Sequence, residues 1–518
     1  MQPILADKAF PELVQWADEL AALRRDIHAH PELGFETPRT VDLIVKTLKG
    51  WGLEHVDPDE VKGGVVVVIN GAAPGATVAL RADIDALPMP DNSANPWKSQ
   101  TEMRCHACGH DGHAAWLLGA LRYLHEKRAS FKGRVVGIFQ PAEEIGRGAL
   151  RVVQSGVFEH WGIQEVYGAH DEPTVAKGQY GLCAGPAQAS TDFFYITVKG
   201  RGVHAARPHL GVDPITTAGV LIGALQTIVS RKVNPIETAV LSISSVNGGN
   251  FHTPNVIPET VTLSGTVRTF NEDVRNQIEA EMARMVERVA EAENCTGEFR
   301  YDRLVPSLFN TPEAVEHIRS FITHQFGAEH AEEMPISMGG EDFAEYTFKV
   351  PGCIIRAGIR DDSHKAALHH PTFDFNDEVI PATATVLAGT VLERLAALSY
   401  TLNVLRPRAA APSAAFCISS AQTYAFRYLS HLRRVFSLGS FPVLLPCLTG
   451  HRSLGNSCPP HHLVARIHHD RGCRNAPYGV AQRRTHDAEG ARCLLSLRAH
   501  HRRQLGHLRL CHCFRPHH

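Results

Sequence analysis

Apolar and polar positions between residues 60 and 170 follow two alternating periods. β-Branched apolar runs bounded by glycine and proline predict buried strands at 63–70 and 76–82. Apolar residues at helical spacing between 113 and 128 then predict an amphipathic helix. The alternation continues with a strand at 133–139, a helix across 148–158 and a strand at 165–170. Strands that alternate with helices predict an α/β sheet with helices on its faces.

From about residue 187 the pattern changes. A strand at 192–200 is followed by a helix, with Asp213 expected as its N-cap and Pro214 as its first residue. Two strands (238–246 and 260–270), a long helix over 272–293 and a short strand near 297–304 come next. The order βαββαβ predicts a ferredoxin-like unit.

Residues 303–400 then return to a helix, a glycine-rich loop and a strand. At 518 residues the chain is too long for one ordinary core, so more than one domain is expected. We predict an α/β catalytic domain built from residues 1–186 and 303–400. A smaller α+β lid domain, 187–302, is inserted into it.

Residues 401–518 differ from the rest in composition. They hold 17 Arg, no Lys, 3 acidic residues, 7 of the 12 Cys and 13 of the 31 His, whereas residues 1–400 carry a net charge of −16. A basic nucleic-acid arm would normally mix Lys with Arg, and a zinc module would repeat paired ligands at regular spacing. We favour the hypothesis that this tail, which has no clear period, is frameshifted or disordered. Resequencing the gene around codon 400 tests it.

The N-terminal stretch has acidic residues early and lacks the basic region and apolar run of a signal peptide. No window of about 18 uncharged apolar residues is present. We therefore expect a cytoplasmic protein that does not engage a membrane. The negative charge of residues 1–400 also argues against nucleic acid as a partner.

Polar side chains gather where the predicted strands end. Open α/β sheets bind ligands at the carboxyl ends of their strands, so these side chains are expected at one edge of the sheet. Their types suit a metal: thiolate, imidazole and carboxylate groups. They are Asp83 and Asp85 after one strand, Cys108 and His110 ahead of a helix, Glu143 and Glu144 after another strand, and His170 at the end of a third.

Each of these patterns alone allows a simpler interpretation. Cys105 and Cys108 have the C-x-x-C spacing of a redox pair, and adjacent glutamates are often a solvated helix start. Lone histidines are usually surface or core residues, and "SMGGEDF" (337–343) reads as an ordinary helix N-terminus. Convergence on one sheet edge favours catalysis, in which one carboxylate binds a metal and its neighbour accepts a proton.

A series of motifs carries a family resemblance over residues 10–398. It closely resembles the two-metal aminoacylase and carboxypeptidase superfamily, in particular the branch of hippurate hydrolases, N-acyl-amino-acid amidohydrolases and auxin-conjugate hydrolases. The motifs, in that family's order, are "RRDIHAHPELGFET", "LRADIDALPM", "HACGHDGHAA", "FQPAEE", "GAHDEP", "GVHAARPHLGVDP", "NVIPE", "GTVRTF", "GGEDF" and "LHHPTFDFND".

The resemblance implies a metallopeptidase-like catalytic domain that holds two divalent ions, Zn, Mn, Co or Ni. Glu143 looks like the general base, and Asp83 and Asp85 look like acids that orient the ligands. The implied metal ligands are Cys108, His110, Glu144, His170 and His369.

The resemblance also gives the inserted domain a role. His204 looks like the residue that steadies the developing oxyanion, and in some relatives it is lent across a dimer. Asn255 and Arg268 look like contacts to the substrate carboxylate or oxyanion. A homodimer or homotetramer through the lid and a hinge near residues 187 and 302 are expected.

Three positions depart from the family pattern. Asp171 and Glu172 stand where this branch commonly has an amide and an aromatic residue, which would add negative charge near the pocket. Val203 replaces the first glycine of a "G-G-H" motif. The doubled His369–His370 leaves open which of the two histidines is the ligand, although alignment favours His369.

The implied function is a metal-dependent amidohydrolase that cleaves hippurate-like N-acyl amino acids to a carboxylic acid and a free amino acid. The expected partner is therefore a small N-acyl amino acid. A carboxypeptidase or an N-acetyl-diamino-acid deacetylase is the alternative on the same site. A catalytically inactive metal- or ligand-binding protein is the alternative of another class.

Overall fold

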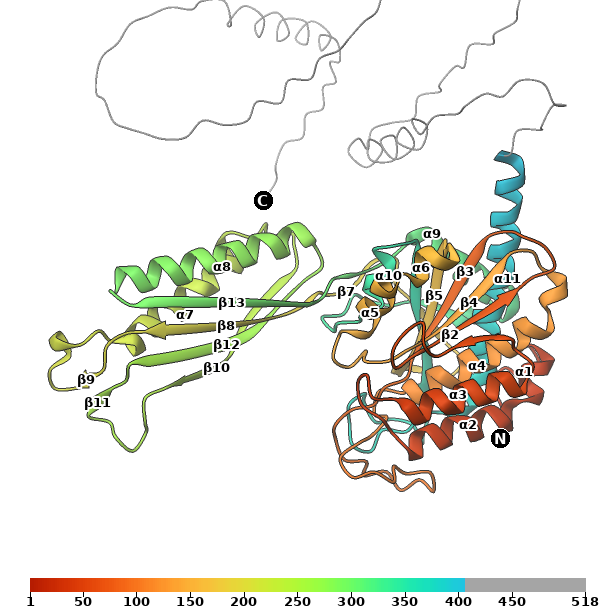
Figure 1. Cartoon of the computed structure of the whole chain (residues 1–518), viewed down its shortest axis with the longest axis horizontal. Helices are drawn as coiled ribbons and strands as arrows, with labels where there is room; N and C mark the ends of the chain where they lie inside the picture. The colour runs from red at the N-terminus through yellow and green to blue at the C-terminus, as the bar shows by residue number, and fades with distance from the viewer. Residues whose placement is uncertain (406–518) are drawn as a thin grey trace, which may run out of the picture. The chain divides into compact units, whose positions relative to one another are not determined.

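The computed structural model describes residues 1–405, with side chains described up to residue 399 (Figure 1). The Arg-, His- and Cys-rich tail predicted from residue 401 therefore lies outside the described residues, apart from the end of the last helix.

An eight-stranded sheet forms the centre of the first domain, in the order β1-β2-β4-β3-β5-β16-β6-β15. Its inner pairs β4–β3, β3–β5 and β5–β16 are parallel, which brings the carboxyl ends of these strands to one edge. The strands are β1 (His55–Asp57), β2 (Val65–Asn70), β3 (Thr77–Asp83), β4 (Arg134–Gln140), β5 (Glu165–Ala176), β6 (Tyr180–Leu182), β15 (Ala331–Glu333) and β16 (Gly352–Arg360).

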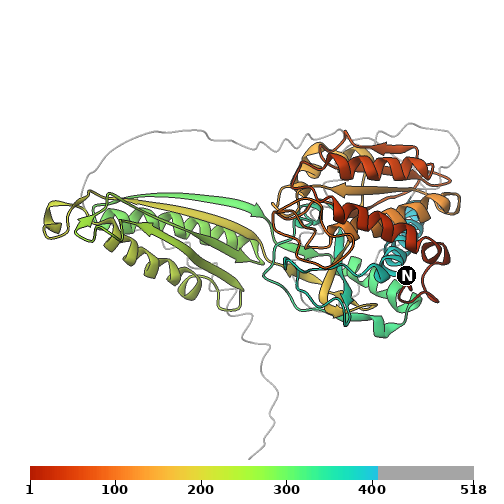
Figure 2. The same ribbon diagram turned by 90° about the horizontal axis from the view of Figure 1, so that it is seen from below.

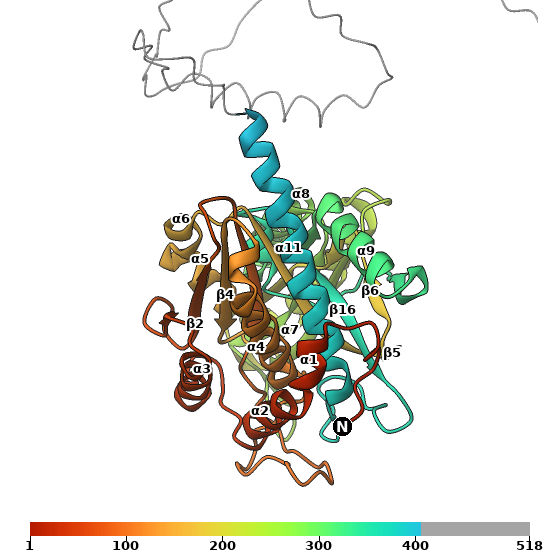
Figure 3. The same cartoon turned by 90° about the vertical axis from the view of Figure 1, so that its right-hand side faces the viewer.

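Helices cover both faces of this sheet. Alternate residues of β2 belong to two different hydrophobic clusters, Val65 and Val67 to one and Val66 and Val68 to the other, as expected for a strand buried on both sides. Figure 3 shows α11 running beside α4 and α1 over one face. The helices are α1 (Pro11–Gln15), α2 (Ala17–Ala29), α3 (Pro38–Gly50), α4 (His110–Glu126), α5 (Gly148–Ser155), α6 (Val157–Trp161), α9 (Pro312–Gln325), α10 (Ala344–Thr347) and α11 (Ile380–Leu405).

Two predicted elements differ from those observed. The single helix expected across 148–158 is two helices, α5 and α6, because Gly156 between them has a φ of +85° and ends the first. The strand expected at 165–170 continues to Ala176 as β5, because it pairs with β16 along that length. The other strands and helices of this sheet region lie within a few residues of their predicted bounds.

One helical stretch within the described residues, Asp377–Ser399, is long and apolar enough to cross a membrane by length and composition alone. However, 78% of its apolar window is buried inside the protein, where α11 packs against α4 and α9. Packing in the core therefore accounts for its apolar composition.

The ferredoxin-like unit is confirmed. An antiparallel sheet in the order β10-β12-β8-β13 packs on two helices, and its core is separate from the two clusters of the first domain (Figure 2). The Asp213 carboxylate caps its first helix by accepting hydrogen bonds from the backbone N–H of Ile215 (2.9 Å) and Thr216 (3.3 Å). The elements are β8 (Thr191–Lys199), α7 (Pro214–Arg231), β10 (Ala239–Gly248), β12 (Thr260–Thr269), α8 (Glu272–Ala292) and β13 (Thr296–Val305).

Two short ribbons complete the described part of the fold. In the inserted unit, β9 (Val203–His204) pairs with β11 (Val256–Ile257). At its junction with the first domain, β7 (Gly185–Gln188) pairs with β14 (Leu308–Asn310). The exact domain limits at residues 187 and 302 stay predictions.

Candidate metal centre

The centre is built where α4 begins. Cys108 and Gly109 directly precede His110, the first residue of α4. Gly109 has a φ of +76°, and a β-carbon on it would collide with the Asp171 carboxylate. Glycine therefore lets the chain place a thiol and an imidazole two residues apart at the sheet edge.

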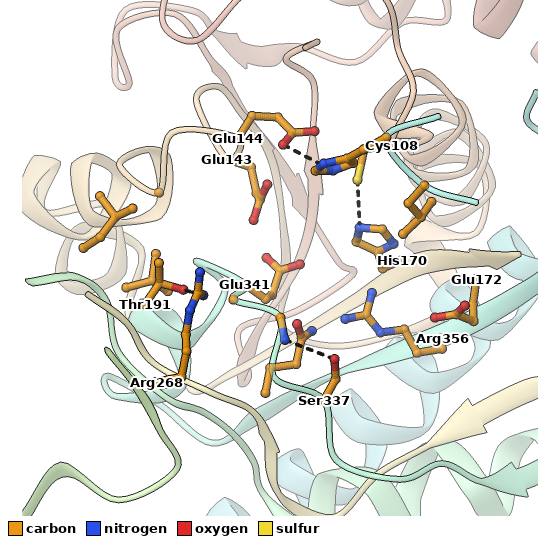
Figure 4. Close-up of a pocket in the computed structure, with 18 of the residues that line it drawn as sticks. Cys108, Glu143, Glu144, His170, Glu172, Thr191, Arg268, Ser337, Glu341 and Arg356 are labelled. Carbon is orange, nitrogen blue, oxygen red and sulfur yellow. Dashed lines mark hydrogen bonds and ion pairs between the residues drawn. The ribbon is translucent and has the colours of Figure 1, made fainter. Parts of the chain in front are cut away.

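Five candidate donor side chains converge there, of which Figure 4 labels Cys108, Glu144 and His170. Cys108 Sγ lies 3.6 Å from His170 Nε2, and the two carboxylate oxygens of Glu144 lie 3.9 Å from His110 Nε2 and 3.6 Å from His369 Nε2. Their donor atoms form two groups, each with all atoms within 4.8 Å of one another. These groups are Cys108, His110 and His170, and Cys108, Glu144 and His369.

Two polar atoms of the candidate donors are buried without a hydrogen-bond partner in the described residues: His110 Nε2 and Glu144 Oε1. Burying such atoms without a hydrogen bond costs free energy, so a site that leaves two of them together is suited to a ligand. Sulfur, nitrogen and oxygen donors in this arrangement fit a divalent metal of the Zn, Mn, Co or Ni type.

Neighbouring side chains hold the donors in place. His110 Nδ1 donates to the backbone oxygen of Asp85 (2.8 Å), which leaves Nε2 free to face the centre. The Asp85 carboxylate accepts the backbone N–H groups of Glu143 (2.9 Å) and Glu144 (3.3 Å). Asp83 contacts His113 Nδ1 (2.5 Å) and Arg81 Nη1 (2.8 Å). Both aspartates thus contact residues of the cluster, and their role in orienting metal ligands stays a prediction.

Burial and nearby charges shift the pKa values of the candidate donors and of Glu143. Burial raises the pKa of Glu144 to about 7, with Asp85 and Asp83 adding to the shift and His110 opposing it. Burial also raises the pKa of Glu143, and Glu341 and Asp342 act in the same direction. Burial lowers the pKa of His110, but Asp83, Cys108 and Asp85 together outweigh this effect and raise the pKa. A bound cation would favour the deprotonated forms of the thiol and carboxyl groups.

The candidate donor His369 and a residue next to Glu143 have unusual backbone conformations. Ala142, directly before Glu143, has a φ of +60°, and His369 has a φ of +61°. Such conformations are uncommon for residues other than glycine and concentrate at functional sites. His369 lines the cavity, whereas His370 lies outside it and its Nδ1 contacts Thr372 Oγ1 at 2.8 Å.

A cavity of about 430 Å³ opens in front of the donors. Arg268, from β12 of the inserted unit, lines it and donates to Thr191 Oγ1. Glu143, the predicted general base, also lines it, and Figure 4 shows its carboxylate between Glu144 and Glu341. The cavity is therefore bounded by both the central sheet and the inserted unit.

Two predicted residues lie elsewhere. His204 is on β9 and Asn255 directly precedes β11, and both are exposed and do not line the cavity. The His204 ring accepts from the backbone N–H of Ala206 (3.1 Å), and the Asn255 carbonyl accepts from Ala205 (2.9 Å). Their roles toward substrate stay predictions.

Several buried residues beside the centre have no role assigned from the sequence alone. Arg81 donates to Asp342 (2.9 Å) and forms an ion pair with Glu341 (3.2 Å). The "GGEDF" motif thus supplies two buried acids as well as a helix start. Arg81 belongs to the "LRADIDALPM" motif, two residues before Asp83. Only the fold pairs them, because they are far apart in sequence.

The charge expected from Asp171 is directed away from the cavity. Its carboxylate is buried and contacts His113 Nε2 at 2.9 Å, so of the two acids in "HDEP" only Glu172 lines the cavity. His113 was overlooked because its two partners, Asp83 and Asp171, come from different strands.

Comparison with known proteins gives consistent matches. Residues 79–393 match the sequence profile of peptidase family M20/M25/M40. The chain is 41% identical over 362 residues to the N-acetyl-L-cysteine deacetylase of Bacillus subtilis (strain 168), covering 70% of this chain and 85% of that protein. It is 35% identical over 393 residues to the Arabidopsis thaliana protein named IAA-amino acid hydrolase ILR1-like 4, covering 74% and 88%.

A solved structure shares the fold. The Bacillus subtilis YXEP protein, described as a dinuclear metal binding peptidase from the M20 family, superposes with a TM-score of 0.65 at 34% sequence identity. The match covers 74% of this chain and 99% of that one.

Proposed function

This chain belongs to peptidase family M20/M25/M40 and is a hydrolase of amide bonds, and we propose that its substrates are N-acyl amino acids of the hippurate type. The relatives named above act, by their names, on an N-acetyl amino acid and on amino acid conjugates. We propose two divalent ions as cofactors, held by Cys108, His110, Glu144, His170 and His369.

One observation carries this proposal. Unpaired buried atoms of His110 and Glu144 face the same space, and a second carboxylate, Glu143, stands beside them without being needed as a donor. A metal centre with an additional carboxylate next to it is the arrangement that amide hydrolysis by water requires.

In this mechanism the bound ions would polarise the amide carbonyl and lower the pKa of a water molecule. A carboxylate oxygen of Glu143 accepts a proton from the attacking water and passes it to the nitrogen of the leaving amine. Burial and the nearby Glu341 and Asp342 raise the pKa of Glu143, which suits a group that must accept a proton and then release it. Asp85 fixes the Glu143 backbone, so the carboxylate is presented from a rigid position.

Arg268 is proposed to bind the carboxylate of the amino acid. Its guanidinium is half-buried at the cavity wall and held by Thr191, so one end is fixed while the remaining N–H groups face the cavity. We assign His204 and Asn255 to the oxyanion and substrate carboxylate, a role that requires movement of the lid or the lid of a second subunit. A homodimer or homotetramer and a cytoplasmic location belong to the same proposal.

The test is release of glycine from N-benzoylglycine by the full-length chain, stripped of metal and reloaded with Mn, Co or Zn. Glu143→Gln is expected to keep the bound metal and to lower kcat by about 10²- to 10⁴-fold, because the amide cannot accept the proton. The matched control is Glu159→Gln, a surface glutamate that hydrogen-bonds Lys349 (2.9 Å).

Full activity of Glu143→Gln would end the assignment of the general base. Release of amino acids only from dipeptides, or only from N-acetyl-diamino acids, would favour the alternative substrates. Metal binding without turnover of any such substrate would favour an inactive binding protein.

A further inference from the structure

A second arginine lines the cavity from the central sheet. Arg356 lies on β16, whereas Arg268 comes from the inserted unit, and Figure 4 shows the two on different sides of the cavity. One arginine is enough to bind the single carboxylate of a hippurate-like substrate. The second therefore calls for a separate explanation.

The strand register directs Arg356 toward the metal centre. In the parallel pair β5–β16, Arg356 is the direct neighbour of His170. Directly paired residues of neighbouring strands point to the same face of a sheet, so the arginine side chain emerges on the side of this donor histidine. Both residues line the cavity.

The Arg356 guanidinium has no hydrogen bond or ion pair to another residue in the part of the chain that the structure describes. Two other arginines of the same domain that are shielded from solvent are paired: Arg81 with Asp83 (2.8 Å) and Arg394 with Glu165 (2.6 Å). Glu172, two positions along β5 from His170 and on the same face, uses Oε1 to accept the backbone N–H (3.1 Å) and hydroxyl (2.7 Å) of Thr174. Figure 4 shows the guanidinium extended past Glu172 into the cavity.

A side pocket of about 70 Å³ adjoins the main cavity at this arginine. Both hollows are lined by Glu172, Gln188, Ser337 and Arg356. The side pocket has room for a group of only a few heavy atoms, and polar groups such as Asn310 reach its wall. A half-buried, unpaired guanidinium at its entrance suits a carboxylate, which it can bind through two parallel hydrogen bonds.

We infer that Arg356 forms a second anion subsite, which selects N-acyl amino acids that carry a second carboxylate besides the one bound by Arg268. This inference rests on the proposed function, since it names a narrower class of substrate for the same site. The second carboxylate comes either from the side chain of the amino acid or from the acyl group.

The experiment compares four substrates on the full-length, metal-loaded chain: N-acetylglycine, N-acetylaspartate, N-acetylglutamate and N-succinylglycine. The aspartate and glutamate derivatives carry the second carboxylate on the amino acid, and the succinyl derivative carries it on the acyl group. We expect a higher kcat/KM for one of these dicarboxylates than for N-acetylglycine. Arg356→Met should lower that preference by about 10- to 100-fold, mainly through KM.

Two further variants complete the design. Arg356→Lys keeps the charge but loses the paired hydrogen bonds, so part of the preference should return. Arg360→Met is the matched control, because Arg360 is an exposed arginine on the same strand that donates to the Pro173 carbonyl (3.4 Å) and does not line the cavity. Its preference should equal that of the unmodified chain.

If N-acetylglycine is hydrolysed and Arg356→Met has the same preference for dicarboxylates as the unmodified chain, the subsite is overturned. The proposed function is then left intact. If no substrate is turned over, the proposed function fails, and equilibrium binding of N-acetylglutamate and N-succinylglycine decides the subsite. Affinity at least tenfold weaker in Arg356→Met supports it. If a folded Arg356→Met variant binds each of these ligands as tightly as the unmodified chain does, the subsite is overturned.

Discussion

The metal centre and the lid each contain a cluster of buried charged side chains, but the clusters differ in whether their polar atoms are paired. In the lid, Asp192 on β8 meets Arg275 on α8 through two hydrogen bonds of 2.5 and 2.9 Å, and accepts a third from Tyr301 on β13 (2.9 Å). Glu272 and the Val305 carbonyl accept the remaining guanidinium hydrogen bonds (3.1 and 3.2 Å). This cluster is complete within the chain.

At the metal centre, by contrast, not every buried polar atom has a hydrogen-bond partner in the described part of the chain. His110 Nε2 and Glu144 Oε1 are buried and have no hydrogen-bond partner among the described residues. Burial of charge is costly in both regions, and both contain internal ion pairs, but only at the metal centre do candidate donor atoms stay without a hydrogen bond to the residues that the structure describes. Complete pairing marks a cluster that holds elements together, whereas incomplete pairing at a cavity marks one that awaits a ligand.

The largest effect on stability is expected from breaking the complete cluster. Arg275→Met leaves Asp192 buried and uncompensated, so we expect unfolding to become easier by about 3–5 kcal/mol. Urea denaturation of the full-length chain measures this change. Metal affinity should stay the same, because the cluster contributes no donor to the centre.

Arg303→Met is the matched control for that variant. Arg303 also pairs with an acid of α8, Glu279, but both side chains are partly exposed, so the loss should be at most about 1 kcal/mol. If Arg275→Met is as stable as Arg303→Met, the buried Asp192–Arg275 pair contributes no more to the stability of the lid than an exposed pair does.

Much of the fold could be predicted because hydrophobic period and capping act locally. Strands such as β3 and helix α8 follow from patterns within their own residues, and Asp213 caps α7 through bonds two and three residues away. The break at Gly156 was missed because the apolar pattern continues across it. Only the backbone conformation shows that the first helix has ended.

The candidate site was predictable where its proposed donors come in short motifs, and less so where partners meet through tertiary structure. Cys108 and His110 stand together in one segment, so their proximity was evident. Arg81 and Asp342 form a hydrogen bond although they are 261 positions apart in the sequence, and no local sequence pattern predicts that contact. Arg356 lies in an apolar strand, and only its register beside His170 shows that it faces the cavity.

Metal should stabilise the protein through the incomplete cluster alone. At a concentration 100 times Kd, a divalent ion that binds only the folded chain adds about 2.7 kcal/mol of stability. We expect this gain, measured as a rise in the urea midpoint, to be lost in His110→Ala. It should persist in the control His160→Ala, whose side chain is exposed and contacts Glu60 at 2.8 Å. An equal gain in both variants would place the metal elsewhere.

The smallest effect concerns a group that is fully paired but exposed. The Asp213 carboxylate accepts two backbone N–H groups and the Thr216 hydroxyl (2.7 Å), so its pairing resembles that of Asp192, while water reaches it. Asp213→Ala should therefore cost about 1 kcal/mol, the usual loss of an N-cap, and Asp213→Asn should restore most of it. Urea denaturation beside Arg275→Met compares the two. If Asp213→Ala lowers the free energy of unfolding as much as Arg275→Met does, pairing alone sets the loss of stability. If it lowers it by about a third as much, burial of the charge sets the loss.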